Sequence, residues 1–245
     1  MSTPSSTIPW RPRSGGAVAL QVHGPTASGA APVVFLGGLG LGPDWSFYPY
    51  LIERIALDRP VVVPLAPEPY TLSAERDALD VLLRALGGGE RPPGVDWTHR
   101  GPIGMVGHAK GASLGLLVAA EHDVVGAIVA IAPLCAFKRL TEDDETLQRD
   151  MVEHAQDFHL EMAVRGLRSK VVLIAGEEDH VVPIVEAETV FHWMPKDGSS
   201  LVLLEKTGHS LGAQHPFEGS NRELDRVVLI ARELFDRELG PAPAS

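Results

Sequence analysis

The 245-residue sequence has little cysteine and few aromatic side chains: it contains one cysteine, Cys135, and 6% Phe, Trp and Tyr. A single cysteine excludes a disulfide within the chain and a thiolate metal site. No apolar run approaches the roughly 20 residues that a membrane-spanning helix needs, so we expect no membrane span. Positive charge is also scarce, because 21 Lys and Arg face 32 Asp and Glu, for a net charge of −11. This balance argues against nucleic acid and anionic lipid surfaces as partners.

Cofactor-binding motifs are missing as well. The ten histidines show no H-E-x-x-H or similar ligand spacing, and the glycine-rich turn at 37–40 matches neither the phosphate loop G-x-x-x-x-G-K-[ST] nor a dinucleotide-binding G-x-G-x-x-G. We therefore expect no metal and no cofactor. Residues 1–16 are polar and lack the apolar centre of a secretory signal. We expect a flexible tail there and a cytoplasmic protein, with a secreted mature form as the alternative.

Short apolar runs alternate with helical patterns through the rest of the chain. Most of these runs are continuously apolar, as is typical of parallel strands that helices cover on both faces. Apolar residues within 79–86 and 224–235 recur at the 3.6-residue spacing of helices that face a core. The alternation predicts an α/β fold with a mostly parallel, doubly wound sheet, in one domain over residues 17–240. The expected strands are 17–22, 33–36, 61–63, 103–106, 127–131, 171–174 and 201–204.

An acidic helical stretch at about 138–169 interrupts this alternation after the fifth expected strand. Thr141 and Asp144 have the spacing of a capping box, which predicts the start of a helix. An insertion at this place can overhang the strand ends as a small cap, with Phe158 and Met162 facing the substrate. Packing of these two side chains onto the body of the protein is the alternative.

The stretch Gly107-His108-Ala109-Lys110-Gly111 has the frame of a nucleophile elbow, G-x-S-x-G, with alanine in place of serine. It follows the expected strand 103–106 and precedes a helical segment, as an elbow does. The two glycines let strand and helix approach closely, and the helix N-terminus places backbone N–H groups beside the reacting centre. A glycine pair that merely packs a helix on a sheet is the alternative. Because a methyl group cannot attack a carbonyl, Ala109 marks the nucleophile position without its chemistry.

A candidate acid and a candidate base follow the elbow. Asp179 comes shortly after the expected strand 171–174, where a carboxylate can fix the tautomer of a histidine; Glu177 and Glu178 compete with it for this role. Capping of the helix that follows is the alternative function of these carboxylates. His209 lies on the loop after the next strand and is the candidate general base. The chain order nucleophile, acid, base is one of those used by serine hydrolases.

The glycine-rich turn after the 33–36 strand offers an oxyanion hole, which needs backbone donors aimed at a developing alkoxide. The amides of Leu39 and Lys110 are the expected pair. The residues that we expect to contact substrate around this turn are Gly38, Trp45, Phe47, Tyr48 and His108, with core packing of the aromatic side chains as the alternative.

With these motifs, the chain resembles the α/β-hydrolase superfamily over nearly its whole length, and within it the dienelactone hydrolase, chlorophyllase and cutinase-like branch. The order of the elbow, acid and base motifs carries the resemblance. Shorter matches are Ser46-Phe47-Tyr48, Val61-Val62-Val63-Pro64, Ala132-Pro133, G-x-x-D-x-x-x-P at 176–183 and Gly208-His209. The resemblance implies an α/β-hydrolase fold and catalytic roles for Asp179 and His209. Two departures are Gly37, where a histidine is common, and Ala109, where the nucleophile belongs.

These features predict a Ser-His-Asp esterase scaffold that acts on a small-molecule or polymeric ester and lacks its nucleophile at position 109. Retention of Asp179, His209 and both elbow glycines favours a deliberate serine-to-alanine change, which leaves substrate uncleaved. One alternative is a natural homologue without catalysis that binds a small ligand or a protein. Another is a lyase or cofactor-free oxygenase that uses Asp179 and His209 as a base. The sequence sets neither the particular ester nor the oligomeric state.

Overall fold

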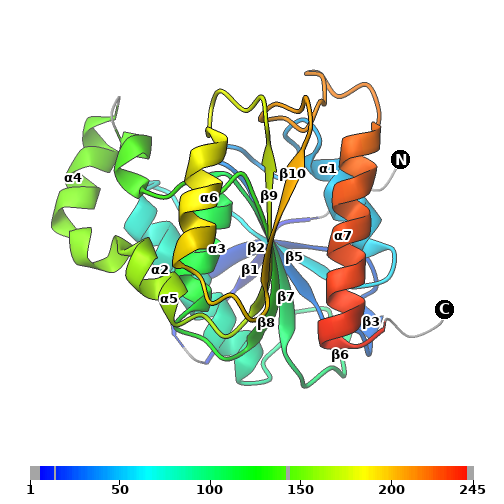
Figure 1. Cartoon of the computed structure of the whole chain (residues 1–245). Coiled ribbons are helices and arrows are strands. Elements are labelled where there is room, and N and C mark those ends of the chain that lie inside the picture. The colour runs from blue at the N-terminus through cyan, green and yellow to red at the C-terminus, as the bar shows by residue number, and fades with distance from the viewer. Residues whose placement is uncertain (1–5, 14, 142–143, 242–245) are drawn as a thin grey trace.

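An eight-stranded sheet forms the centre of the computed structural model, which describes residues 6–13, 15–141 and 144–241 (Figure 1). The strands lie in the order β1-β2-β5-β4-β7-β8-β9-β10. Pairing is antiparallel between β1 and β2 and between β2 and β5, and parallel from β5 through to β10. The strands are β1 (Ile8–Trp10), β2 (Val18–His23), β4 (Val33–Leu36), β5 (Val61–Pro64), β7 (Ile103–His108), β8 (Val125–Ile131), β9 (Lys170–Gly176) and β10 (Ser199–Leu204). A separate parallel pair consists of β3 (Ala27–Ser28) and β6 (Asp96–Trp97).

The predicted α/β class with a mostly parallel sheet is confirmed, and each of the expected strands is present within a few residues of its predicted ends. The N-terminal segment needs a correction. Within the predicted flexible tail, Ile8–Trp10 form the edge strand β1, which pairs with residues 18–20 of β2 and buries Trp10. Three residues carry too little periodicity to reveal a strand, so this one is defined by its partner.

Helices cover both faces of the sheet (Figure 1). On one face lie α1 (Tyr48–Ala56) and α7 (Arg222–Leu239). The other face is covered by α2 (Leu72–Gly87), α3 (Lys110–Ala119), α5 (Leu160–Arg165) and α6 (Ile184–Trp193). Every residue of β4 and β7 is buried, which explains why the runs 33–36 and 103–106 contain no polar side chain.

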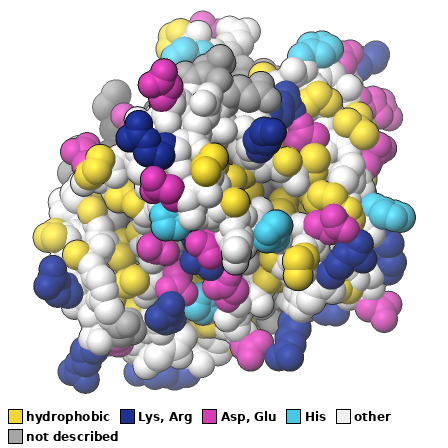
Figure 2. Space-filling view, turned by 90° about the vertical axis from the view of Figure 1, so that its left-hand side faces the viewer, with side chains coloured by type: hydrophobic (Ala, Val, Ile, Leu, Met, Phe, Trp, Pro, Cys, Tyr) yellow, Lys and Arg dark blue, Asp and Glu magenta, His cyan; other side chains and the backbone are white. Residues whose placement is uncertain are grey.

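Apart from residues 142 and 143, the inserted segment 138–169 consists mainly of short helices, as expected, but these pack along one helix layer beside the sheet rather than over the strand ends (Figure 1). Its helix α4 (Glu145–Glu153) packs on α2, where the Ser73 amide donates a 3.0 Å hydrogen bond to the Asp150 carboxylate. Further along, α5 packs on α3 and α6. The segment thus widens one helix layer. Figure 2 shows the outer face of this layer, where acidic and basic side chains are interspersed with small apolar areas.

The start of α4 differs from the predicted capping box. Asp144 is the N-cap, and its carboxylate accepts hydrogen bonds from the amides of Thr146 and Leu147 at 2.9 and 3.0 Å. The Thr141 hydroxyl instead donates to the carbonyl of Lys138 and belongs to the short 3-10 helix before it. Residues 142 and 143, inside the predicted helical stretch, lie outside the described residues.

The loops that carry the predicted site leave the carboxyl ends of β4, β7, β9 and β10, at one edge of the parallel sheet. From β4 the chain passes to β5 on one side and later to β7 on the other, so the strand order reverses between β4 and β7. Open α/β sheets bind ligands at such a point, outside the carboxyl ends of the strands. The turn after β4 and the elbow after β7 flank it directly.

Candidate active site

Ala109 occupies a strained backbone turn between β7 and α3. It is the N-cap of α3, with φ 52° and ψ −118°, a combination that residues with a side chain rarely adopt. Its amide donates a 2.8 Å hydrogen bond to the carbonyl of Ile131, which fixes the turn against β8. The backbone therefore has the geometry of a nucleophile elbow although the side chain is only a methyl group.

The elbow glycines are required by close backbone contacts. A Cβ atom on Gly107 would lie 2.5 Å from the Cα of Ala112, inside the first turn of α3. A Cβ atom on Gly111 would lie 2.4 Å from the carbonyl oxygens of both Leu36 and Gly37. The second contact brings α3 against the turn after β4, so Gly111 sets the distance between the two predicted halves of the oxyanion hole.

Asp179 and His209 form a hydrogen-bonded pair. Oδ2 of Asp179 lies 2.9 Å from Nδ1 of His209, and its Oδ1 accepts hydrogen bonds from the amides of Val181 and Val182 at 2.9 and 2.8 Å. Burial by itself raises the pKa of the Asp179 carboxyl, but the hydrogen bonds from His209, Val182 and Val181 outweigh it and hold that pKa below its usual value. The carboxylate thus stays ionised and orients the imidazole.

The structure also distinguishes among the three candidate carboxylates. Glu177 and Glu178 are exposed, whereas Asp179 is buried and bonded to His209. Its loop is attached to the loop of the base, because the Glu178 amide donates to the carbonyl of Thr207 at 3.0 Å. The helix α6 begins directly after its N-cap residue Pro183 and has no side-chain cap, so none of the three carboxylates caps it.

His209 lies beside the elbow. Its ring centroid is 4.6 Å from that of His108, the residue directly before Ala109. Because Asp179 occupies Nδ1, Nε2 is the nitrogen that remains for proton transfer. The structure therefore pairs the predicted base with the predicted acid, and it places the base ring against His108, the neighbour of the predicted nucleophile position.

Behind the site, a buried hydrogen-bonded relay passes through Tyr48 and His108. The Gly38 amide donates to the Tyr48 hydroxyl at 2.8 Å, and this hydroxyl lies 2.8 Å from Nδ1 of His108. Because the amide can only donate, the Tyr48 hydroxyl accepts from it and donates its own proton to Nδ1 of His108. The ring proton of His108 is then on Nε2, which donates to the backbone carbonyl of His209 at 3.1 Å. Burial, with a smaller effect from nearby His209, lowers the pKa of His108 to about 3, which keeps its ring neutral. The relay joins the turn after β4, the elbow and the base loop.

The two predicted oxyanion-hole amides are available as donors. Lys110 is the first residue of α3, and an N–H at that position has no acceptor within the helix. Among the described residues, no acceptor is paired with the Leu39 N–H, whereas the neighbouring Gly38 N–H is used by Tyr48. The helix N-terminus adds its partial positive charge at the same point.

The predicted substrate-contacting aromatic residues have mixed positions. Phe47, Tyr48 and His108 are fully buried, and they support the site from behind. Trp45 is partly exposed, and its ring lies 6.3 Å, centroid to centroid, from the rings of His108 and His215 in near-parallel orientation. Of this group, Trp45 is the one with surface left for a ligand.

The two predicted contacts from the inserted segment are not brought to the site. Phe158 is buried against Phe137, with ring centroids 5.1 Å apart, in the core under that helix layer. Met162 is 74% exposed on α5, which packs on α3 and α6. Both assignments assumed a cap over the strand ends, and the position of the segment beside the sheet corrects them.

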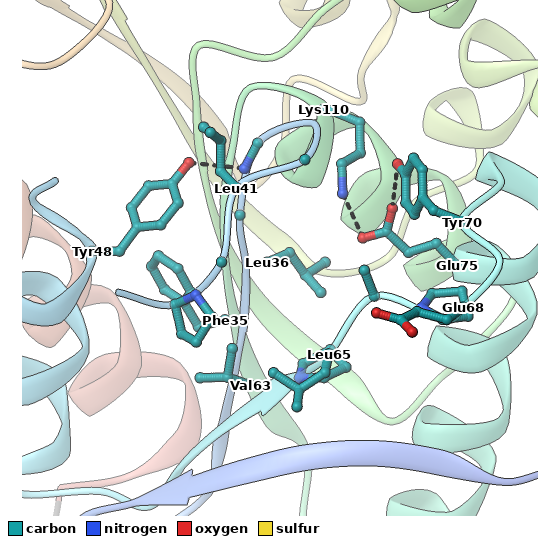
Figure 3. Close-up of a pocket in the computed structure, with 18 residues that line it drawn as sticks. Phe35, Leu36, Leu41, Tyr48, Val63, Leu65, Glu68, Tyr70, Glu75 and Lys110 are labelled. Atoms are coloured by element: carbon teal, nitrogen blue, oxygen red, sulfur yellow. Dashed lines mark hydrogen bonds and ion pairs between the residues drawn. The ribbon is translucent and has the colours of Figure 1, made fainter. Parts of the chain in front are cut away.

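A cavity of about 300 Å³ lies next to the turn after β4, and sequence reasoning missed it (Figure 3). Gly38 and Lys110 line it together with residues of the loop after β5 and the first turn of α2. Glu75 and Tyr70 contribute polar groups there. No motif marks these two residues, because Tyr70 bonds to Glu75 and the partner that brings Glu75 to the cavity, Lys110, is 35 positions away in the chain.

In the described part of the chain, no cluster of three or more His, Cys, Asp and Glu side chains is arranged to bind a metal ion. None of the described helices is both long and apolar enough to cross a membrane.

No protein-family model and no curated protein matches the chain. Solved structures do resemble it. The esterase domain of a Rhodothermus marinus protein has 17% identity and a TM-score of 0.70, covering 97% of this chain and 100% of that one. The apo form of Thermogutta terrifontis esterase 2 has 17% identity and a TM-score of 0.75, covering 100% and 98%.

A third similar structure is a serine-to-alanine mutant of CumD, the meta-cleavage product hydrolase of Pseudomonas fluorescens IP01, in complex with acetates. It has 14% identity and a TM-score of 0.64, covering 95% of this chain and 97% of that one. At such identities the likeness concerns architecture, and it establishes that the chain has the α/β-hydrolase fold.

Proposed function

We propose that this site is that of a carboxylic-ester hydrolase of the Ser-His-Asp type, present here without its nucleophile. The observation that supports this most is the hydrogen bond of 2.9 Å between Asp179 and His209, formed beside a strained elbow at position 109. An oriented base, a sharp turn at a helix start and two free amides are the parts that acyl transfer requires. The folds of the esterases that resemble this chain are compatible with it.

With serine at position 109, the reaction would proceed in two steps. Nε2 of His209 takes the hydroxyl proton while the serine oxygen attacks the ester carbonyl, and the carbonyl oxygen becomes an alkoxide held by the amides of Leu39 and Lys110. His209 then gives the proton to the departing alcohol. Water, deprotonated by the same ring, cleaves the acyl-enzyme to the carboxylic acid and regenerates the serine.

With alanine at position 109, the same site holds an ester without cleaving it. Nothing in the first step replaces the missing oxygen, since Ala109 offers a methyl group and is only 8% exposed. In another serine hydrolase, loss of the nucleophile lowers turnover on the order of 10⁶-fold. We therefore expect ester binding by the unaltered chain, and hydrolysis after the change Ala109→Ser.

The test is the hydrolysis of short-chain and medium-chain p-nitrophenyl esters by the Ala109→Ser variant. We expect a saturable release of p-nitrophenol that the double variant Ala109→Ser/His209→Ala and the unaltered chain do not show. The double variant is the matched control, because a surface-catalysed background would survive in it. If Ala109→Ser hydrolyses no ester of either length while remaining folded, the esterase proposal is refuted.

The intact Asp179–His209 pair in a chain without a nucleophile favours a second candidate, proton abstraction from a carbon acid. This reaction needs the base and the amides but no attacking oxygen. Hydrogen exchange of a substrate C–H with deuterated solvent, catalysed by the unaltered chain and abolished by His209→Ala, would favour it over the esterase.

A further inference from the structure

The cavity of about 300 Å³ beside the site has room for a chain of roughly ten non-hydrogen atoms, at about 30 Å³ for each. Its walls come from the turn after β4, from the loop after β5 and from the start of α2 (Figure 3). Gly37, Gly38 and Lys110 line it, so the cavity borders the turn and the helix start that carry the two proposed oxyanion amides. Most of the wall is apolar, with Leu36, Leu41 and Leu65 among its residues.

The position of the cavity relative to His209 decides which part of an ester fits it. In the proposed reaction His209 protonates the departing alcohol, so the alcohol must lie on the side of that ring. The cavity lies at the ends of β4 and β5, on one side of the elbow, and no residue of the loop that carries His209 lines it. The acyl chain therefore extends toward the cavity. This step rests on the proposed function.

One wall of the cavity carries a charged cluster. The ammonium group of Lys110 forms an ion pair with Oε1 of Glu75, and the Tyr70 hydroxyl donates to Oε2 of Glu75 at 2.9 Å (Figure 3). The side chain of Lys110 is 3% exposed and that of Glu75 16%. An ammonium group has three N–H donors, and Glu75 is its one hydrogen-bond partner among the described side chains and carbonyls. Donors thus remain for a ligand.

Stability does not account for a lysine at this position. A buried ion pair is often no more stable than apolar residues of the same volume, because both charges lose their hydration. Lys110 is also the first residue of α3, and the partial positive charge of a helix N-terminus disfavours a cation there. The ion pair with Glu75 offsets these costs, and a buried ion pair of this kind is weak evidence for a stabilising role.

We propose that this cavity is the acyl subsite and that Lys110 selects neutral acyl chains that carry a hydrogen-bond acceptor, such as an ether or carbonyl oxygen. The acceptor binds a free N–H of the Lys110 ammonium group, and the apolar wall holds the methylene groups. An anionic chain is disfavoured, because the charged residues that line the cavity are Lys110, Glu75 and Glu68, which together carry a net negative charge.

The test compares p-nitrophenyl esters of hexanoate, γ-methoxybutyrate and β-ethoxypropionate in the Ala109→Ser variant. The two ethers have as many non-hydrogen atoms as hexanoate and place the oxygen at two positions. We expect kcat/KM for the better ether to exceed that for hexanoate about 10-fold to 100-fold, the range for a hydrogen bond to a charged group. The mono-p-nitrophenyl ester of adipate, which is anionic, should be hydrolysed more slowly than hexanoate.

Two further substitutions assign the selectivity to the cluster. In Ala109→Ser/Lys110→Met, whose backbone amide is kept, the ratio of ether to hexanoate should fall to about one, since no donor remains. In Ala109→Ser/Glu75→Gln, the ammonium group loses its counter-charge, and the ratio of adipate monoester to hexanoate should rise about 10-fold. Each ratio is internal to one variant, so a general loss of activity does not affect it.

A kcat/KM for the better ether that does not exceed that for hexanoate at least threefold in the Ala109→Ser variant, or a preference for the adipate monoester, would overturn the subsite assignment and leave the esterase proposal intact. If no ester is hydrolysed, calorimetric titration of the unaltered chain with methyl γ-methoxybutyrate and methyl hexanoate tests the subsite assignment by itself. Tighter binding of the ether that disappears in Lys110→Met would support the subsite although the esterase proposal had failed. Equal binding of the two esters, or no binding of either, would overturn the subsite assignment.

Discussion

Acid should destabilise this fold through His108, the buried histidine behind the elbow. Its pKa is lowered to about 3 from an ordinary value of 6.5 because the ring is fully buried. Between these two values the unfolded chain binds a proton at His108 that the folded chain does not bind. The free energy of unfolding therefore falls as the pH decreases. The contribution of neutral His108 is fully present above pH 6.5 and is lost as the pH falls toward 3.

The magnitude follows from the size of the shift. Each pH unit within this window removes about 1.4 kcal/mol from the free energy of unfolding. Between pH 7 and pH 5 the loss through His108 amounts to about 2 kcal/mol. Asp179 adds little over the same range. Its pKa is lowered from 3.8, so its carboxyl is almost fully ionised at pH 5 in both states, and its stabilising effect is lost only at lower pH.

Urea unfolding at pH 7 and pH 5 measures this effect in the unaltered chain and in His108→Gln. The variant loses the relay and should be less stable at both values, but the drop between them should be about 2 kcal/mol smaller. The change His192→Gln, on the exposed side of α6, is the matched control and should keep the full drop. An equal drop in His108→Gln would mean that His108 is not held neutral, and the assignment of the relay would have to be abandoned.

Three other predictions concern the elbow and the relay. Gly111→Ala should lower the free energy of unfolding, measured in urea, by about 3 kcal/mol, because the new methyl group would lie 2.4 Å from two carbonyl oxygens. The control Gly166→Ala, whose methyl group would lie 3.9 Å from its nearest neighbour, should change this free energy by about 0.5 kcal/mol or less. Equal effects of the two substitutions would contradict the close contact at Gly111. In an Ala109→Ser background, Tyr48→Phe should lower kcat about 10-fold with little change in KM, because the turn that carries the oxyanion donors loses its anchor; an unchanged kcat would refute the positioning role. In the same background, Asp179→Asn should lower kcat on the order of 10⁴-fold, the loss seen for such an aspartate in another serine hydrolase, and activity within tenfold of the parent would exclude it as the orienting acid.

Local patterns in the chain are sufficient for much of this fold. Strands that are buried on both faces produce continuous apolar runs, and a glycine pair around a sharp turn needs only five residues to be recognised. The runs at β4 and β7 and the elbow between β7 and α3 could for this reason be predicted. The edge strand β1 could not, because its three residues are held by pairing with β2.

Some residues of the candidate site could likewise be predicted from local patterns, and others could not. The sequence places Asp179 and His209 at strand ends, in an order that brings them to one edge of a parallel sheet. It contains no signal that Phe158 turns into the core, or that Glu75 meets Lys110 beside a cavity. These contacts join elements far apart in the chain, and a residue alone does not indicate which distant neighbour it will have.

By itself, the amino-acid sequence determined the succession of strands and helices, the position of the elbow and the alanine at its centre, because each of these is a property of neighbouring residues. Only the tertiary structure decided that a phenol and a neutral imidazole connect the turn after β4 to the loop that carries His209, and that a lysine and a glutamate form part of the cavity wall. The physical reason is that burial and hydrogen-bond partners depend on how whole elements pack, and packing is specified by the complete chain rather than by any short segment of it.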